Sequence, residues 1–255
     1  MQRTEIPPKI LIPRGRGAAA EAQRDADVLR FVGRFRFVTD QLLAEKFEVS
    51  RQQMNLRLRR LANAGLLQRT DGRTQPRLTM LTRKGARAVD LPIRRSPRTD
   101  AQREHELCLV WLVIELERAG TARVRTEREC RTLEAAGAGQ YSVFVLQPGR
   151  PQERRWPDLV LEGEGRRSAI ELELSAKGTT RLQAIVAAYA AALVYDEVVF
   201  LALDVAIARR IAGACVRGQP PQDPTTHTPG VRLHVVPWPG LSAAAQHALA
   251  EVLRH

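Results

Sequence analysis

The sequence lacks the features that mark secreted and membrane-spanning proteins. It has only three cysteines, an odd number without CxxC spacing, which argues against a disulfide framework and a zinc site. No stretch approaches the roughly 18 apolar residues that a membrane helix needs. The basic, proline-containing amino terminus also has no apolar run long enough for a secretory signal. We therefore expect a cytoplasmic protein, without membrane partners, whose thiols are reduced and structural.

Lysine is scarce as well, and positive charge is distributed unevenly. Four lysines accompany 36 arginines, and the formal net charge is +12. Residues 1–100 hold 22 basic and 10 acidic residues, whereas residues 101–255 hold 18 of each. A basic region of this kind is typical of proteins that bind the phosphate backbone of nucleic acids. An arginine-rich composition that only solvates the surface is the alternative, but it would not leave the second region neutral.

Changes in composition and periodicity divide the chain into four segments. Residues 1–21 have three prolines and no amphipathic period, which predicts a flexible basic arm. Residues 22–90 contain apolar residues at helical spacing, followed by a hairpin pattern. Residues 91–100 contain two prolines among basic residues and predict a linker. Residues 101–255 form a second domain.

The first domain has the pattern of a winged helix-turn-helix. We expect a first helix from about residue 22, a second helix capped by Thr39, and a third helix capped by Ser50. A hairpin around the Asp71-Gly72 turn, the wing, and a short helix follow. In such domains the second helix of the helix-turn-helix pair enters the major groove of DNA.

The third expected helix is this second helix of the pair, and the side chains at its start suit base recognition. Arginine can bridge guanine, and Gln or Asn can bridge adenine, each through two hydrogen bonds. The DNA-binding candidates on this helix are Ser50, Arg51, Gln52, Asn55 and Arg59. The candidates for phosphate contacts from the hairpin are Arg69, Arg73 and Arg77. Because helix-turn-helix proteins commonly bind two-fold related half-sites, we expect double-stranded DNA and a second copy of the chain as partners.

The second domain has the pattern of an α/β fold. A long helix ending at Gly120 precedes short strands with helices between them. The expected strands are 122–127, 141–146, 158–163, 168–175, 197–203 and 231–237, and the expected later helices are 179–193, 205–218 and 242–255.

Acidic residues in this domain occupy strand positions that core packing would not favour. Glu171 and Glu173 share one face of a strand because strand side chains alternate, and a hairpin through residues 163–165 would place Asp158 beside Glu171. Asp158 and Glu171 suit Mg²⁺ or Mn²⁺, which would assist hydrolysis of a phosphodiester. Lys177 would supply further positive charge if the chain bends after the strand.

The order PD, a spacer, and ExE with a lysine nearby resembles the PD-(D/E)xK nuclease superfamily. Where that superfamily has a lysine two residues after the acid, this chain has Glu173, so either Glu173 replaces the lysine or Lys177 takes its role. The resemblance implies a restriction-endonuclease-like α/β domain. It also implies an upstream acidic residue, for which the candidates are Glu127, Glu104 and Glu106, with His105 as an assisting residue.

The wider pattern over residues 23–236 resembles the replication-relaxation family, through the predicted winged helix, REHEL, RTERE and IELELSAKGTTRLQAIVAAY. The matching residues are His105, Glu127, Asp158, Glu171, Glu173 and Lys177. This resemblance implies a role in replication, relaxation or conjugative transfer of plasmid or other mobile-element DNA, with other replication or transfer proteins as partners.

Two functions stay open at this point. The protein is either a metal-dependent endonuclease that nicks DNA, or a non-catalytic replication or transcription regulator whose degenerate nuclease-like domain mediates dimerisation or partner binding. For the glutamates, the alternative is a solvent-facing sheet surface with ion pairs to Arg166, Arg167 or Arg181. Residues 178–180, at a helix start, are an alternative phosphate site.

Overall fold

The computed structural model describes residues 16–70, 77–91, 100–120, 122–218 and 231–237, and the chain divides into two compact units. Unit 1 is Met1–Arg98 and unit 2 is Thr99–His255, so the division falls inside the segment predicted as a linker. The fold class is mixed α/β. No helix in the described ranges is long and apolar enough to span a membrane.

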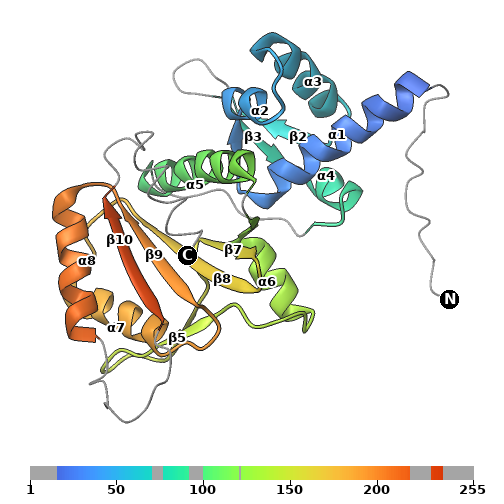
Figure 1. The fold of residues 1–255 in the computed structure, drawn as a ribbon. Coiled ribbons are helices and arrows are strands. Elements are labelled where there is room, and N and C mark those ends of the chain that lie inside the picture. Colours follow the sequence, from blue (N-terminus) through green and yellow to red (C-terminus); the bar gives the residue numbers. More distant parts are fainter. Residues whose placement is uncertain (1–15, 71–76, 92–99, 121, 219–230, 238–255) are drawn as a thin grey trace. The chain divides into compact units, whose positions relative to one another are not determined.

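Unit 1 packs helices against a small antiparallel sheet with strand order β1-β3-β2 (Figure 1). Its elements are α1 (Arg16–Arg34), β1 (Val38–Thr39), α2 (Asp40–Lys46), α3 (Arg51–Asn63), β2 (Leu67–Arg69), β3 (Leu78–Leu81) and α4 (Arg83–Ala88). Helix α1 begins at Arg16, so the prediction of a flexible arm over residues 1–21 is wrong for residues 16–21. Residues 1–15 and the predicted wing turn lie outside the described residues.

Side-chain caps set the start of α2 and of α3. The Thr39 hydroxyl accepts a hydrogen bond from the Leu42 N–H at 3.3 Å. Ser50 forms a capping box with Gln53, in which the Ser50 hydroxyl accepts from the Gln53 N–H and the Ser50 N–H donates to the Gln53 side chain. The prediction of both N-caps is confirmed, and a tight turn therefore separates the two helices.

Unit 2 is built on a five-stranded sheet with strand order β10-β9-β8-β7-β4. Strands β4, β7 and β8 pair antiparallel, whereas β8, β9 and β10 pair parallel, and β5 and β6 form a separate hairpin. The elements are α5 (Asp100–Ala119), β4 (Arg123–Thr126), α6 (Glu127–Ala135), β5 (Val143–Val145), β6 (Glu153–Arg155), β7 (Leu159–Gly163), β8 (Arg166–Glu173), α7 (Thr179–Ala190), β9 (Glu197–Ala202), α8 (Val205–Gly218) and β10 (Arg232–Pro237).

Helix α6 and strand β6 were not predicted from the sequence. The expected strand over residues 122–127 ends at Thr126, because Thr126 and Glu129 form a capping box that starts α6. The predicted last helix, residues 242–255, lies outside the described residues.

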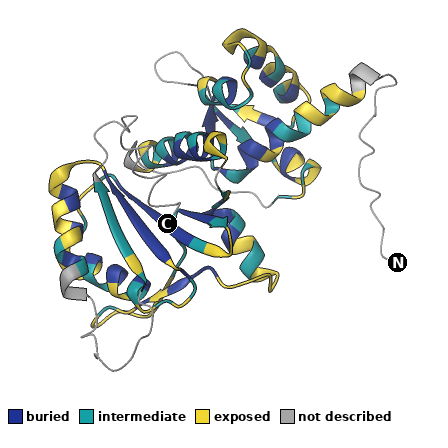
Figure 2. Ribbon diagram, in the orientation of Figure 1, coloured by how far each residue is buried: buried dark blue, intermediate teal, exposed yellow. Residues whose placement is uncertain are grey.

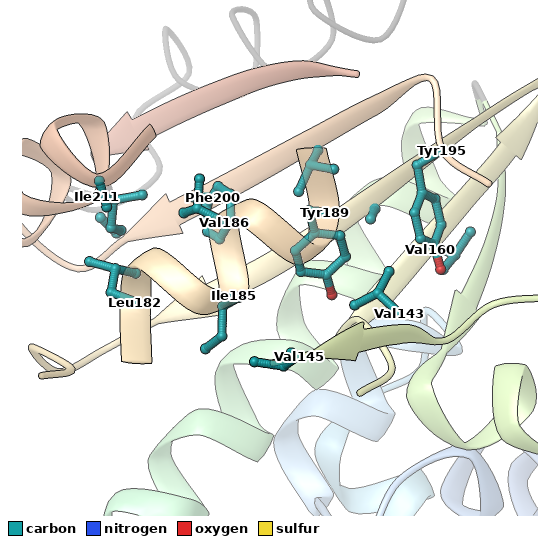
Figure 3. Packing of buried hydrophobic residues seen from close by; sticks show 14 of the residues in the cluster. Val143, Val145, Val160, Leu182, Ile185, Val186, Tyr189, Tyr195, Phe200 and Ile211 are labelled. Atoms are coloured by element: carbon teal, nitrogen blue, oxygen red, sulfur yellow. The ribbon is translucent and has the colours of Figure 1, made fainter. Parts of the chain in front are cut away.

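The two central strands are buried along nearly their whole length (Figure 2). The register pairs Ala169 with Val198 and Glu171 with Phe200, so these side chains share one face of the sheet. On that face, Phe200 belongs to the hydrophobic core that also contains Ile185 and Tyr189 of α7 (Figure 3). The glutamates of β8 therefore face a packed core and not solvent.

Candidate functional site

The fold brings the acidic residues of the PD and ExE motifs together. Asp158 directly precedes β7, and the pairing of Leu159 with Ile170 places it opposite Glu171 of β8. The Leu172 N–H donates to an oxygen of Asp158 at 2.9 Å, which fixes that carboxylate against the strand. Glu171 and Glu173 share one face of β8, as strand alternation predicts, but that face is buried.

Glu171 is fully buried, with 0% of its side chain exposed, and two neighbours donate to it. Arg155 of β6 donates from Nε to Oε1 at 3.3 Å and from a terminal nitrogen to Oε2. The hydroxyl of Tyr189 also donates to Oε1. The charge of Glu171 raises the pKa of Arg155, so this two-point ion pair stays charged. Burial, reinforced by Glu171, raises the pKa of Tyr189 well above its ordinary value, which keeps its hydroxyl a donor.

Asp158 pairs with His105 of α5. The Nε2 atom of His105 lies 3.3 Å from Asp158 Oδ2 and 3.1 Å from the carbonyl oxygen of Leu172, and because both are acceptors, Nε2 carries a proton. Burial lowers the pKa of His105, but the hydrogen bond and charge of Asp158 outweigh it and raise the pKa to about 9. Burial in turn favours a higher pKa for Asp158, yet the contact with His105 keeps that pKa below its ordinary value. Both groups are therefore charged at neutral pH.

Glu173 pairs with Lys177. Strand β8 ends at Glu173, and the chain bends so that the Lys177 ammonium donates back to the Glu173 carboxylate. The bend that this contact requires is therefore present. Arg210 of α8 donates to the Lys177 carbonyl at 3.0 Å and holds the loop. Burial raises the pKa of Glu173, and the charge of Lys177 opposes that effect.

Arg167 and Arg181, two of the arginines expected to pair with Glu171 and Glu173 on a solvent-facing sheet, pair with other acidic residues. Arg181 lies 3.4 Å from Glu153 and Arg167 lies 3.3 Å from Glu162. The expectation that Glu171 and Glu173 pair with such arginines at the surface is wrong, because the two carboxylates are buried and their partners come from β6 and the loop after β8.

The three upstream acidic candidates, Glu127, Glu104 and Glu106, differ in burial and in their contacts. The Glu127 N–H donates to the Asp158 carbonyl at 3.0 Å, but its carboxylate pairs with Arg131 of the same helix at 2.6 Å. On α5, Glu104 is exposed and Glu106 is buried. The upstream residue that does contact the acidic cluster is His105.

These residues do not fit a divalent cation. Mg²⁺ binds proteins through carboxylates that are free to coordinate it. Asp158 and Glu171, the predicted ligands, each face a cationic side chain instead, as Glu173 does, so the charge of the cluster is already balanced. In the part of the chain that the structure describes, no group of three or more His, Cys, Asp or Glu side chains could hold a metal ion.

The exposed side of α3 is the second candidate site. Met54 and Leu58 on its other side are fully buried in unit 1. Arg51, Gln52 and Arg59 are exposed and make no hydrogen bond or ion pair with any described residue. Two guanidinium groups and one amide are therefore available to a ligand from a single helix face.

Arg69 does not belong to that exposed set. Its guanidinium is only 9% exposed, forms an ion pair with Asp40 at the start of α2, and donates to Asn55 Oδ1 at 2.9 Å. Arg69 thus balances an otherwise buried carboxylate, whereas its contact with phosphate stays a prediction. Arg77 is half-buried, and Arg73 lies outside the described residues.

Comparisons with known proteins leave the function undecided. No protein-family model matches the chain, and no curated protein matches it in sequence. A search of solved structures finds the crystal structure of protein VC1899 from Vibrio cholerae, at 11% sequence identity and a TM-score of 0.32. The match covers 92% of this chain and 53% of that protein, so the chain spans about half the length of that relative. Similarity at this level supports no conclusion about fold or function.

Arg155→Ala should lower the free energy of unfolding of unit 2 by about 3–5 kcal/mol, because it leaves Glu171 charged, buried and unpaired. The matched control is Arg181→Ala, which removes an exposed arginine paired with the exposed Glu153 and should cost about 1 kcal/mol or less. Urea unfolding followed by tryptophan fluorescence measures both, since all three tryptophans lie beyond residue 100. Equal losses for the two variants would show that the buried pair has no special role.

The contribution of His105 to stability should depend on pH. Because its folded-state pKa is raised to about 9, the contribution is complete below the ordinary value of 6.5 and is lost as the pH rises through 9. The free-energy difference between wild type and His105→Gln should therefore shrink between pH 7 and pH 10. NMR titration of the imidazole gives the pKa directly, and a midpoint near 6.5 would contradict the charged pair.

Proposed function

We propose that this protein is a non-catalytic DNA-binding factor that contacts double-stranded DNA through the exposed side of α3. The observation that carries the proposal is the set of Arg51, Gln52 and Arg59, whose side chains are exposed on the side opposite the buried residues of α3 and pair with no residue that the structure describes. Side chains of these types at the start of a helix suit hydrogen bonds to base edges and phosphates.

The arrangement of unit 1 supports a winged helix-turn-helix as the DNA-binding module. Helices α2 and α3 are joined by a short capped turn, and the antiparallel strands β2 and β3 follow in the order expected of a wing. Gly85 of α4 allows close packing behind them, since a Cβ there would lie 2.0 Å from the Leu66 carbonyl oxygen. The excess of positive charge in residues 1–100 supports attraction to the phosphate backbone.

Unit 2 supports the non-catalytic part of the proposal. The adjacent Asp158 and Glu171 fit the resemblance to a PD-(D/E)xK domain, but both carboxylates are engaged in ion pairs. A nuclease-like domain with this cluster would serve dimerisation or binding to partner proteins. A role in replication or transfer of mobile-element DNA rests on the sequence resemblance and belongs to the same proposal.

Arg59 and its neighbour Arg60 provide a matched test of the DNA-binding surface. Among the described residues Arg59 has no ion-pair partner, whereas Arg60 is paired with Glu21 and Asp25 of α1. Arg59→Ala should weaken binding to a duplex of random sequence and reduce the slope of log affinity against log salt by about 0.9. Arg60→Ala should leave that slope unchanged. Fluorescence anisotropy at KCl concentrations from about 50 to about 300 mM measures both slopes. Equal slopes for the two variants would show that this side of α3 does not contact DNA.

Incubation with supercoiled, linear and single-stranded DNA tests the non-catalytic assignment. With Mg²⁺, Mn²⁺ or EDTA, wild-type protein should retard duplex DNA without cutting it, because the acidic residues already have cationic partners. Glu171→Gln should behave in the same way. Metal-dependent nicking by the wild type that disappears in Glu171→Gln would identify an endonuclease instead.

A further inference from the structure

Arg69 donates a hydrogen bond to the amide of Asn55, a DNA-binding candidate on α3. A terminal nitrogen of Arg69 lies 2.9 Å from Oδ1 of Asn55. A guanidinium group has donors and no acceptor, so the amide of Asn55 must turn its oxygen toward Arg69. The NH₂ group of Asn55 is consequently directed away from Arg69.

Arg69 is itself held in place by unit 1. It forms an ion pair with Asp40, whose side chain is 11% exposed, and Thr79 of β3 donates to the other oxygen of Asp40 at 3.3 Å. Thr39 caps the helix that begins at Asp40. The network therefore connects β3, the start of α2, β2 and α3, and it restrains the guanidinium from several sides.

Asn55 lies where it can contribute to the exposed side of α3. It is half-buried, and it follows Arg51 and precedes Arg59 by four residues, a spacing that puts all three on neighbouring positions of one helix face. Arg51 and Arg59 offer only hydrogen-bond donors. At the position of Asn55, the orientation of its amide then decides whether a base edge meets a donor or an acceptor.

We propose that Arg69 is a positioning residue that fixes Asn55 with its NH₂ group toward DNA, so that Asn55 selects base edges that accept hydrogen bonds. This inference rests on the proposed function. Two-point recognition of adenine by asparagine needs both an amide donor and an amide acceptor. With its oxygen held by Arg69, Asn55 can only donate, so it favours guanine, whose N7 and O6 both accept, or thymine O4, over adenine, whose N7 acceptor lies beside the N6 donor. The expectation that Asn55 bridges adenine is replaced.

Selection from a duplex library with a randomised central segment, carried out with the full chain, tests the proposal. Wild type should select guanine or thymine at one base pair, and Asn55→Ala should lose that preference. On the selected duplex, Asn55→Ala should bind about 5- to 150-fold more weakly, the range for loss of one base contact. The double variant Asp40→Asn with Arg69→Met removes both charges of the buried pair and the donor to Asn55, so the freed amide should shift the preference toward adenine.

Asn55→Asp is the second variant, because it keeps an oxygen toward Arg69 but has no donor for DNA. It should fold and lose the guanine or thymine preference without gaining adenine. A wild type that selects adenine at the position sensitive to Asn55→Ala overturns the proposal, as does the folded Asp40→Asn, Arg69→Met variant with unchanged base choice. Wild-type selection that Asn55→Ala does not alter overturns this inference alone, whereas a wild type that binds no duplex overturns the proposed function together with it.

Discussion

The ion pair between Glu171 and Arg155 is the interaction on which unit 2 most depends. A carboxylate in the middle of a packed sheet face costs several kcal/mol unless it is paired and hydrogen-bonded, and Arg155 and Tyr189 supply both. Because Arg155 belongs to β6 and Tyr189 to α7, this single carboxylate connects the hairpin and the helix to the central strand of the sheet. The same contacts occupy both carboxylate oxygens of Glu171.

Unit 1 follows the same physical rule, with a buried ion pair of its own. Asp40 and Arg69 form this pair, which also reaches Asn55 on the exposed helix. A buried charge that must be balanced thus restrains a neighbouring side chain. In unit 2 the cations pair with the carboxylates of the candidate site, whereas in unit 1 the paired arginine also holds the amide of Asn55.

Predictions from sequence succeeded where the deciding contact is local. The starts of α2 and α3 depend on Thr39 and Ser50, whose partners lie three residues away. Helix α6 has a signal of the same kind, Thr126 followed three residues later by Glu129, although the sequence pattern predicts a strand as far as residue 127. Alternation in β8 correctly grouped Glu171 with Glu173, since the period of two belongs to the strand itself.

The sequence by itself determined the mixed α/β class, the caps of the DNA-binding candidate helix, the uneven charge, and the set of acidic residues that share a face. Only the tertiary structure decided which cation each acid meets and which arginines stay exposed. Arg155 is 16 residues from Glu171, and Arg69 is 29 residues from Asp40. Pairs at such separations arise from strand register and helix packing, which no local pattern encodes, and they decide whether a charged residue is structural or available to a ligand.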